Sequence, residues 1–372
     1  MIKSSRGCCG KEELAEVQEA FDYGYFGLAY KTNEFEEEIG KYLDTDRMVV
    51  CTNTGTSALH LALDSVGIDL GDEVIMPSFT FVATAQAVKM CGGKVIFCEV
   101  CPDTFLMDME DVKRKITGNT KAIIPVHYAG RPCDMDSLME IHKNTGIRII
   151  EDAAHAFGSE YKGRKIGSFG DITCFSFDSI KVITCGDGGA IVTNDNNVED
   201  LAKKKRLLGI DRKTMVEKDW KKRSWEYDVT TPGYRYHLGN INAAIGLAQI
   251  KKIDKFIARR REICRLYDKE LGEVRGIECM PGGYDDITPF MYVVRVKDGK
   301  RNALKDFLRD HNIESGISYI PCHTFGMFKA DGVNLPITDE IYKEILCLPI
   351  HIELSDEDVK EVVRRIKEFL GS

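Results

Sequence analysis

The chain has 372 residues, of which 43% are hydrophobic and 30% charged, with a net charge of −8 at pH 7 and thirteen scattered cysteines. This composition is typical of a globular protein of two domains, and its negative charge argues against nucleic acid as the main partner. Because no apolar run approaches the roughly 18 residues of a membrane span and the cysteine pattern favours reduced thiols, we expect a cytoplasmic protein without a membrane partner.

The N-terminal part predicts two helices and then a turn that could bind phosphate. Residues 11–45 have apolar residues at helical spacing, interrupted by glycines and aromatic residues at 23–30. A strand at 49–51 then leads through small residues into a helix. Such a turn presents free backbone N–H groups at the positive end of the helix dipole, which suits a phosphate. The candidate ligands are Gly55, Thr56 and Ser57.

Strands and helices then alternate as far as about residue 195. Strands are expected at 73–76, 94–97, 122–126 and 148–150, with helices from near Thr80, at 109–116 and at 135–144. This order predicts an α/β fold with a doubly wound, largely parallel sheet. Phe81, after the first of these strands, is either core or an aromatic plate for a cofactor ring. The CxxC pair Cys98 and Cys101 lacks further ligands, so we expect no metal site.

The main chemical signal lies between residues 148 and 190. The strand at 148–150 runs into carboxylates, and in open parallel sheets ligands lie beyond the carboxyl ends of the strands, so Asp152 points towards a candidate site. Asp152 alone could equally cap a helix or bind a metal or a ribose. A second strand, at 172–177, is followed by Lys181 on a loop. An isolated lysine is most often a solvated surface charge.

Considered together, these residues suggest pyridoxal 5'-phosphate (PLP). A lysine that forms a Schiff base with PLP needs a carboxylate at the pyridine nitrogen and a cradle for the phosphate. The carboxylate keeps the ring protonated, so that the ring can accept electrons from a substrate carbanion. Asp152 and Lys181 could fill two of these roles if their strands lie side by side. The turn at 55–57 is then the expected cradle.

The C-terminal part predicts a smaller α+β unit. One long helix is expected from Ile241 onwards, followed by a strand at 290–296, a helix at 301–311, an extended piece at 316–321 and a last helix with a capping box at 355–358. We expect a large PLP-binding domain over residues 1–250 and a small domain over 251–372. The basic segment 199–231, with Trp220 and Trp225, is a solvated connector or a flap for an anionic substrate.

Several long motifs connect this chain with a known family. They are YGYFGLAYKTNEFEEEI, TNTGTSALHLAL, GDEVIMPSFTFVATAQAV, EDAAHAFGSEYKGRKIGSFGD, SFDSIKVITCGDGGAI, GYRYHLGNINAAIGLAQ and YIPCH. With these motifs, in this order and over nearly its whole length, the chain resembles the DegT-type sugar aminotransferases. These are PLP enzymes of the aspartate-aminotransferase fold that act mainly on nucleotide-linked keto sugars.

The resemblance implies roles for the residues that match these motifs. Lys181 would be the catalytic lysine that binds the cofactor and shuttles protons, and Asp152 would pair with the pyridine nitrogen. Phe81 would stack on the ring, and His155 would lie near the ring oxygen. The remaining implied cofactor ligands are Gly55, Thr56, Ser57 and Ser176 at the phosphate, and Arg235; the implied substrate contacts are Tyr30 and His323.

The resemblance also implies a homodimer with the active site at the subunit interface. In the family, a GYNYR-like segment of one subunit reaches the cofactor phosphate of the other. Here the segment reads GYRYH, with Arg235 where asparagine is usual. An arginine suits a phosphate through its charge and its bidentate geometry. Asp178, Gln86 and Ser318 also depart from the family pattern, around the expected substrate.

The implied reaction is a ping-pong transfer of an amino group from L-glutamate to a nucleotide-linked keto sugar, which yields an amino sugar for a surface polysaccharide or a secondary metabolite. Three alternatives remain open: a PLP lyase, a transaminase of a free keto sugar or keto-cyclitol, and a regulatory protein that kept the fold without catalysis. The intact Lys181, Asp152 and phosphate turn favour catalysis. The related sugar dehydratases carry histidine in place of Lys181.

Overall fold

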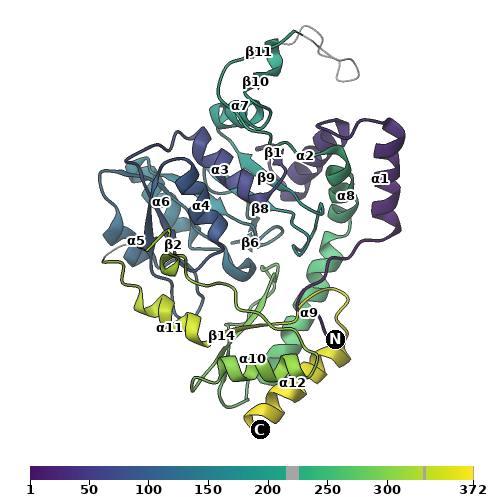
Figure 1. Cartoon of the computed structure of the whole chain (residues 1–372), viewed down its shortest axis with the longest axis vertical. Helices are drawn as coiled ribbons and strands as arrows, with labels where there is room; N and C mark the ends of the chain where they lie inside the picture. Colours follow the sequence, from purple (N-terminus) through teal and green to yellow (C-terminus); the bar gives the residue numbers. More distant parts are fainter. Residues whose placement is uncertain (215–225, 330–331, 372) are drawn as a thin grey trace.

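A seven-stranded mixed sheet forms the centre of the molecule, as the computed structural model of residues 1–214, 226–329 and 332–371 shows (Figure 1). The strands lie in the order β1-β9-β8-β5-β4-β2-β3. Their bounds are β1 Met48–Thr52, β2 Glu73–Pro77, β3 Lys94–Cys98, β4 Thr120–Ile123, β5 Arg148–Asp152, β8 Ile172–Ser176 and β9 Gly189–Thr193. Only β9, among these strands, runs antiparallel to its neighbours. The predicted α/β fold with a mainly parallel sheet is confirmed.

Helices cover both faces of this sheet. On one face α3 (Gly55–Ser65), α4 (Val82–Met90) and α7 (Asn196–Lys205) pack over strand residues such as Val74 and Ile150. On the other face α2 (Tyr30–Leu43), α6 (Met135–Thr145) and α8 (Asn240–Ile250) pack over residues such as Ile75 and Ile149. Neighbouring residues of one strand point to opposite faces, so every second side chain enters the same core. This alternation explains why the strands are apolar throughout.

Strand β4 is shorter than expected. The sequence predicts a strand over 122–126, whereas β4 ends at Ile123. Beyond it the N–H of Ile124 still donates to the carbonyl of Ile75 at 2.8 Å, and Val126 forms only an isolated bridge with Asp152. The regular pairing between β4 and β5 therefore stops before the site.

A second, three-stranded antiparallel sheet lies towards the C-terminus (Figure 1). It consists of β12 (Ile277–Cys279), β13 (Tyr292–Val296) and β14 (Ile345–Leu348), accompanied by α9 (Ile253–Leu271), α10 (Arg301–Asp310) and α12 (Asp356–Leu370). Only β13 was expected, since β12 is very short and β14 has the continuous apolar pattern that a buried helix segment can share. The division at residues 250 and 251 stays a prediction.

The single long helix expected after residue 240 is wrong, because the structure has two. Helix α8 ends at Ile250 and α9 begins at Ile253. Helix α8 contacts α1 and α2, and most of its residues are buried, whereas α9 buries one stripe and contacts α12. The first turns of α9 share the core of α8, through residues such as Ile253 and Phe256, and the later turns enter the C-terminal core. The apolar pattern therefore continues across the break without a visible signal.

The remaining elements are peripheral. They are α1 (Lys11–Tyr23), α5 (Met109–Lys115), α11 (Pro336–Glu344), the short pairs β6 (Glu160–Tyr161) with β7 (Arg164–Lys165) and β10 (Ile210–Asp211) with β11 (Asp228–Val229), and three short 3₁₀ turns. Trp220 and Trp225, on which the flap interpretation partly rests, lie outside the described residues. Within the described part of the chain, none of the helices has both the length and the apolarity to cross a membrane.

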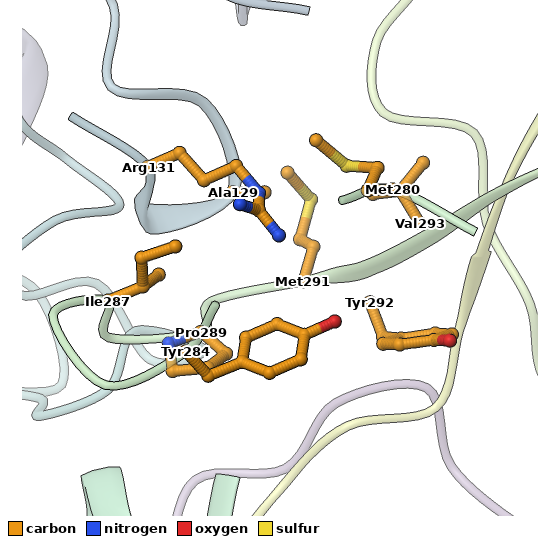
Figure 2. A pocket seen from close by; sticks show the side chains of 9 residues that line it. All are labelled: Ala129, Arg131, Met280, Tyr284, Ile287, Pro289, Met291, Tyr292 and Val293. Carbon is orange, nitrogen blue, oxygen red and sulfur yellow. The ribbon is translucent and has the colours of Figure 1, made fainter. Parts of the chain in front are cut away.

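A small void lies near Arg131, beside Tyr284 and the start of β13 (Figure 2). Its volume is about 10 Å³, which is at the lower limit for a single water. Arg131 lies over the ring of Tyr284 with 5.6 Å to the centroid and donates to the carbonyl of Pro281. This is a packing contact between the large sheet unit and the C-terminal unit, with no room for a substrate.

Candidate active site

A cavity of about 320 Å³ lies at the carboxyl ends of β5 and β8. These strands are parallel neighbours, with Asp152 opposite Cys174, which is the arrangement that the PLP interpretation requires. The cavity also receives the beginning of α3 and the loop between β8 and β9. Of the predicted site residues, those that line it are Gly55, Thr56, Phe81, Asp152, His155, Ser176 and Lys181.

Asp152 is a buried carboxylate at the end of β5. The hydroxyl of Thr84 donates to Oδ2 at 2.7 Å, and the N–H of Ala154 donates to Oδ1 at 3.2 Å. Burial raises the pKa of Asp152, and these hydrogen bonds and the positive charge of Lys181 oppose the rise. A cationic N–H partner within the cavity would stabilise the ionised form of this buried carboxylate.

Lys181 is a partly buried amine on the loop between β8 and β9. Its Nζ lies 4.3 Å from the centroid of the Phe290 ring. Burial lowers the pKa of Lys181 to about 8, although Asp152 and Asp178 act in the opposite direction. A lysine with a lowered pKa supplies a neutral, nucleophilic amine close to neutral pH.

In the cofactor-free protein, Lys181 should become reactive towards acetic anhydride with a midpoint near pH 8. Below this pH its ammonium form has no lone pair, and the ordinary midpoint of a lysine is about pH 10.4. Competitive acetylation read by mass spectrometry measures this midpoint. The exposed Lys162 is the control, because its hydrogen bond with Asp136 raises its pKa. A Lys181 midpoint at or above that of Lys162 contradicts the prediction.

The start of α3, which the sequence predicts as a phosphate cradle, lies at the cavity. Thr54 caps the helix, with its hydroxyl accepting from the N–H of Ser57 at 2.9 Å. The hydroxyl of Ser57 is occupied within this cap, where it lies 2.7 Å from Asn53 Oδ1, and Ser57 does not line the cavity. A Cβ on Gly55 would lie only 2.7 Å from the Cβ of Ser176. Glycine therefore keeps the first-turn N–H groups close to the Ser176 hydroxyl.

His155 lies inside an aromatic stack that the sequence did not reveal. Its ring lies parallel to Phe290 with centroids 4.2 Å apart, and its Nε2 is 3.0 Å from the hydroxyl of Tyr319. Its Nδ1 is buried and has no partner among the described residues. Burial, together with the charge of Lys181, lowers the pKa of His155, so the ring is neutral. An orphaned polar atom here suits a ligand with its own polar group.

Phe81 is exposed at the cavity rather than buried in the core. Its side chain is 54% exposed, and its ring centroid lies 5.6 Å from that of Tyr319. A large aromatic side chain with an open face beside a cavity is suited to stacking on a planar ring. The core alternative for Phe81 is therefore wrong.

The structure does not bring the remaining predicted residues into this cavity. The Arg235 side chain is exposed. The side-chain amide of Asn53 donates to the backbone carbonyl of Arg235, with an N···O distance of 3.5 Å. Tyr30 packs against Tyr23 with ring centroids 4.9 Å apart and lines a different hollow, beside Lys31. His323 Nδ1 is 2.7 Å from the hydroxyl of Ser78. Within one chain, these three residues lie away from Lys181.

Sequence reasoning did not assign roles to Thr84 and Tyr319, which line the cavity, or to Phe290, which contacts Lys181 and His155. Thr84 binds Asp152 from the first turn of α4, while Phe290 and Tyr319 arrive from the C-terminal unit. Tyr319 lies within the YIPCH motif, so its position was signalled although its contact was not. Thr84, within α4, and Phe290, just before β13, carry no local signal of these contacts.

These residues fit PLP. The helix start and Ser176 suit a phosphate, Phe81 provides a face for the ring, and Asp152 offers a buried carboxylate. His155 Nδ1 lacks a hydrogen-bond partner among the residues that the structure describes. The fold and this cavity define the class of PLP-dependent aminotransferases that share the aspartate-aminotransferase fold.

The chain belongs to the DegT/DnrJ/EryC1/StrS aminotransferase family, whose profile matches residues 7–367. It is 36% identical over 362 residues to the GDP-perosamine synthase of Escherichia coli O157:H7, covering 97% of this chain and 96% of that protein. Its structure is similar to that of the aminotransferase TlmJ from Streptoalloteichus hindustanus, with a TM-score of 0.93, 32% identity, and coverage of 100% of this chain and 99% of that one. It is also similar to the PLP form of Spr1654 from Streptococcus pneumoniae, with a TM-score of 0.91, 29% identity, and coverage of 100% and 98%.

Proposed function

We propose that this aminotransferase moves an amino group from L-glutamate to a nucleotide-linked keto sugar, as a cytoplasmic homodimer with Lys181 as its catalytic residue. The observation that carries the proposal is the single cavity in which Lys181 and Asp152 meet the start of α3. A relative named for a GDP-linked product supports the nucleotide linkage. The intact lysine favours amino-group transfer over dehydration.

In this proposal each residue has a defined task. When bound, PLP supplies an electrophilic carbon that takes up the amino group and a ring that accepts electrons. Asp152 holds a proton at the ring nitrogen, and the N–H groups of Gly55 and Thr56 with the Ser176 hydroxyl bind the phosphate. Lys181 anchors the cofactor and then moves a proton to or from the reacting carbon through Nζ. Its pKa of about 8 lets it act in both directions near neutral pH.

The test of this function is the visible absorption of the PLP-loaded protein during two additions. L-glutamate should remove the band of the bound cofactor and release 2-oxoglutarate, and a nucleotide-linked 3-keto or 4-keto sugar should restore it. Recovery only with free keto sugars or keto-cyclitols would overturn the nucleotide linkage. Loss of an amino acid substrate without 2-oxoglutarate would support a lyase instead.

The residues that are missing from the cavity support the proposed homodimer. Arg235 is expected at the cofactor phosphate, yet its side chain is exposed away from its own Lys181. Its segment is held to the cradle loop, since the N–H of Asn53 donates to the carbonyl of Tyr236 at 2.7 Å. We propose that Arg235 completes the site of a second copy of the chain. Exposed Phe21 and Phe26, whose rings are in contact, offer apolar surface for such an assembly.

Hybrid dimers test this assignment. R235A should weaken PLP binding by about tenfold, because a charge-assisted contact with the phosphate is lost. A hybrid of one K181A subunit and one R235A subunit should then contain one fully intact site and retain about half of the wild-type activity, since one of its two sites is doubly altered. Differently tagged subunits allow the hybrid to be isolated and assayed. If Arg235 serves its own subunit, the hybrid instead has no intact site.

A further inference from the structure

A buried carboxylate lies directly behind Asp152, on the opposite face of the sheet. Glu151 is 0% exposed, and it accepts the hydroxyl hydrogen of Thr173 on Oε1 at 2.7 Å and meets His127 Nε2 at 2.9 Å through Oε2. Because side chains alternate along a strand, Glu151 points away from the cavity that Asp152 enters.

The hydrogen bonds of His127 define which atom carries its proton. The N–H of Cys133 donates to Nδ1 at 3.0 Å. Burial favours the neutral form of His127, whereas its hydrogen bonds with Cys133 and Glu151 act to raise its pKa. The Cys133 donor is a backbone N–H, however, and it needs an unprotonated Nδ1. We therefore assign the neutral ring, with its proton on Nε2 donated to Glu151.

His127 also holds the backbone of Asp152. Its N–H donates to the carbonyl of Asp152 at 3.1 Å, and the N–H of Asp152 donates to the carbonyl of Pro125 at 2.9 Å. The regular ladder between β4 and β5 ends with Ile123 opposite Ile149. The segment that follows β4 is thus attached to the end of β5 twice at His127, by its backbone to Asp152 and by its side chain to Glu151.

We propose that Glu151 is a positioning residue for the cofactor site, which acts through His127 to fix the end of β5 and hence the carboxylate of Asp152. The inference rests on the proposed pairing of Asp152 with the pyridine nitrogen. A carboxylate that stabilises a developing or fixed charge must be held within a fraction of an ångström, which requires support from behind. The Glu151–His127 bond adds a side-chain attachment to the two backbone hydrogen bonds that hold the end of β5 beyond the regular ladder.

The experiment compares two matched pairs of variants. Glu99 is a second buried carboxylate, which accepts from the Thr338 hydroxyl at 2.6 Å, and it does not line the cavity. E151L and E99L each remove a buried carboxylate, whereas the milder T173V and T338V each remove only the hydroxyl that donates to it. For every variant we would measure the melting temperature, the dissociation constant for PLP and the ¹⁵N shift of labelled pyridine nitrogen in bound PLP.

We expect E151L to weaken PLP binding by about tenfold and to move the ¹⁵N shift towards that of an unprotonated ring. T173V should change the PLP affinity and the ¹⁵N shift in the same direction, but less. E151Q should stay close to wild type in both measurements, because an amide can still accept from His127 and donate to the Thr173 oxygen. E99L and T338V should lower the melting temperature without affecting either cofactor measurement.

Equal PLP affinities and ¹⁵N shifts for the Glu151 and Glu99 pairs would overturn the inference and leave Glu151 a purely structural residue. If E151L does not fold, T173V against T338V decides the question in the same way. A wild-type protein that fails to bind PLP would contradict the proposed function itself, so the two failures are distinguishable.

Discussion

Replacing Lys181 by alanine should lower kcat for transamination by about 10⁴-fold or more, because the variant loses both the covalent anchor and the proton carrier. Among the described residues that line the cavity, Lys181 is the only one with an amine side chain. Steady-state kinetics with glutamate and the accepted keto sugar measure the loss.

A chemical readout separates loss of the amine from loss of the fold. Borohydride reduction of the PLP-loaded wild-type protein should leave the cofactor attached to the peptide that contains Lys181, and K181A should retain none after denaturation. K162A is the control, because Lys162 is exposed and paired with Asp136 at the surface. Normal turnover by K181A, or attachment at another lysine, would refute the central assignment.

Replacing Asp152 by asparagine has the second largest expected effect. A neutral amide cannot keep the ring nitrogen protonated, so the ring accepts electrons poorly and kcat should fall by about 10²–10⁴-fold. The ¹⁵N shift of bound PLP should move to that of an unprotonated ring. Single-turnover reaction with glutamate shows whether the loss lies in the first half of the cycle.

Asp187 provides the matched control for this variant. It lines the same cavity, and burial raises its pKa as it does for Asp152, but its Oδ1 accepts from the N–H of Gly188 at 3.0 Å on the loop before β9. D187N should leave the ring nitrogen unchanged, and D152E should recover part of the activity. A shifted ¹⁵N signal in D187N but not in D152N would reverse the assignment of the pyridine partner.

Some strands could be predicted from the sequence and others could not. The strands around Asp152 and Lys181 were predictable because each is an apolar run that ends in residues of distinct chemistry. The PLP hypothesis required these two strands to lie side by side, which the sequence could not show. The parallel pairing of β5 with β8 in the structure fulfils this requirement. The two C-terminal strands β12 and β14 were missed, since short apolar segments have no period that distinguishes strand from buried helix.

In the candidate site, too, the local features were predictable and the contacts between distant segments were not. The sequence predicted the helix start at Gly55, because a helix start is a local feature, and its phosphate role stays a prediction. The sequence could not show that the Ser57 hydroxyl is occupied by Asn53 and the Thr54 cap. It also could not choose between core and cofactor plate for Phe81, which depends on what the ring faces after folding. The contacts of Phe290 and Tyr319 with His155 join parts of the chain that are far apart in sequence.

By itself, the sequence determined the class of fold, the family and the chemically distinctive residues Lys181 and Asp152, since side-chain type and local order are properties of contiguous residues. Only the tertiary structure decided which of the predicted residues share one cavity, which lie elsewhere as Arg235, Tyr30 and His323 do, and that Glu151 and His127 lie behind Asp152. Burial, distance and hydrogen-bond partnership arise between segments that meet only when the chain folds, and they decide what each side chain can do.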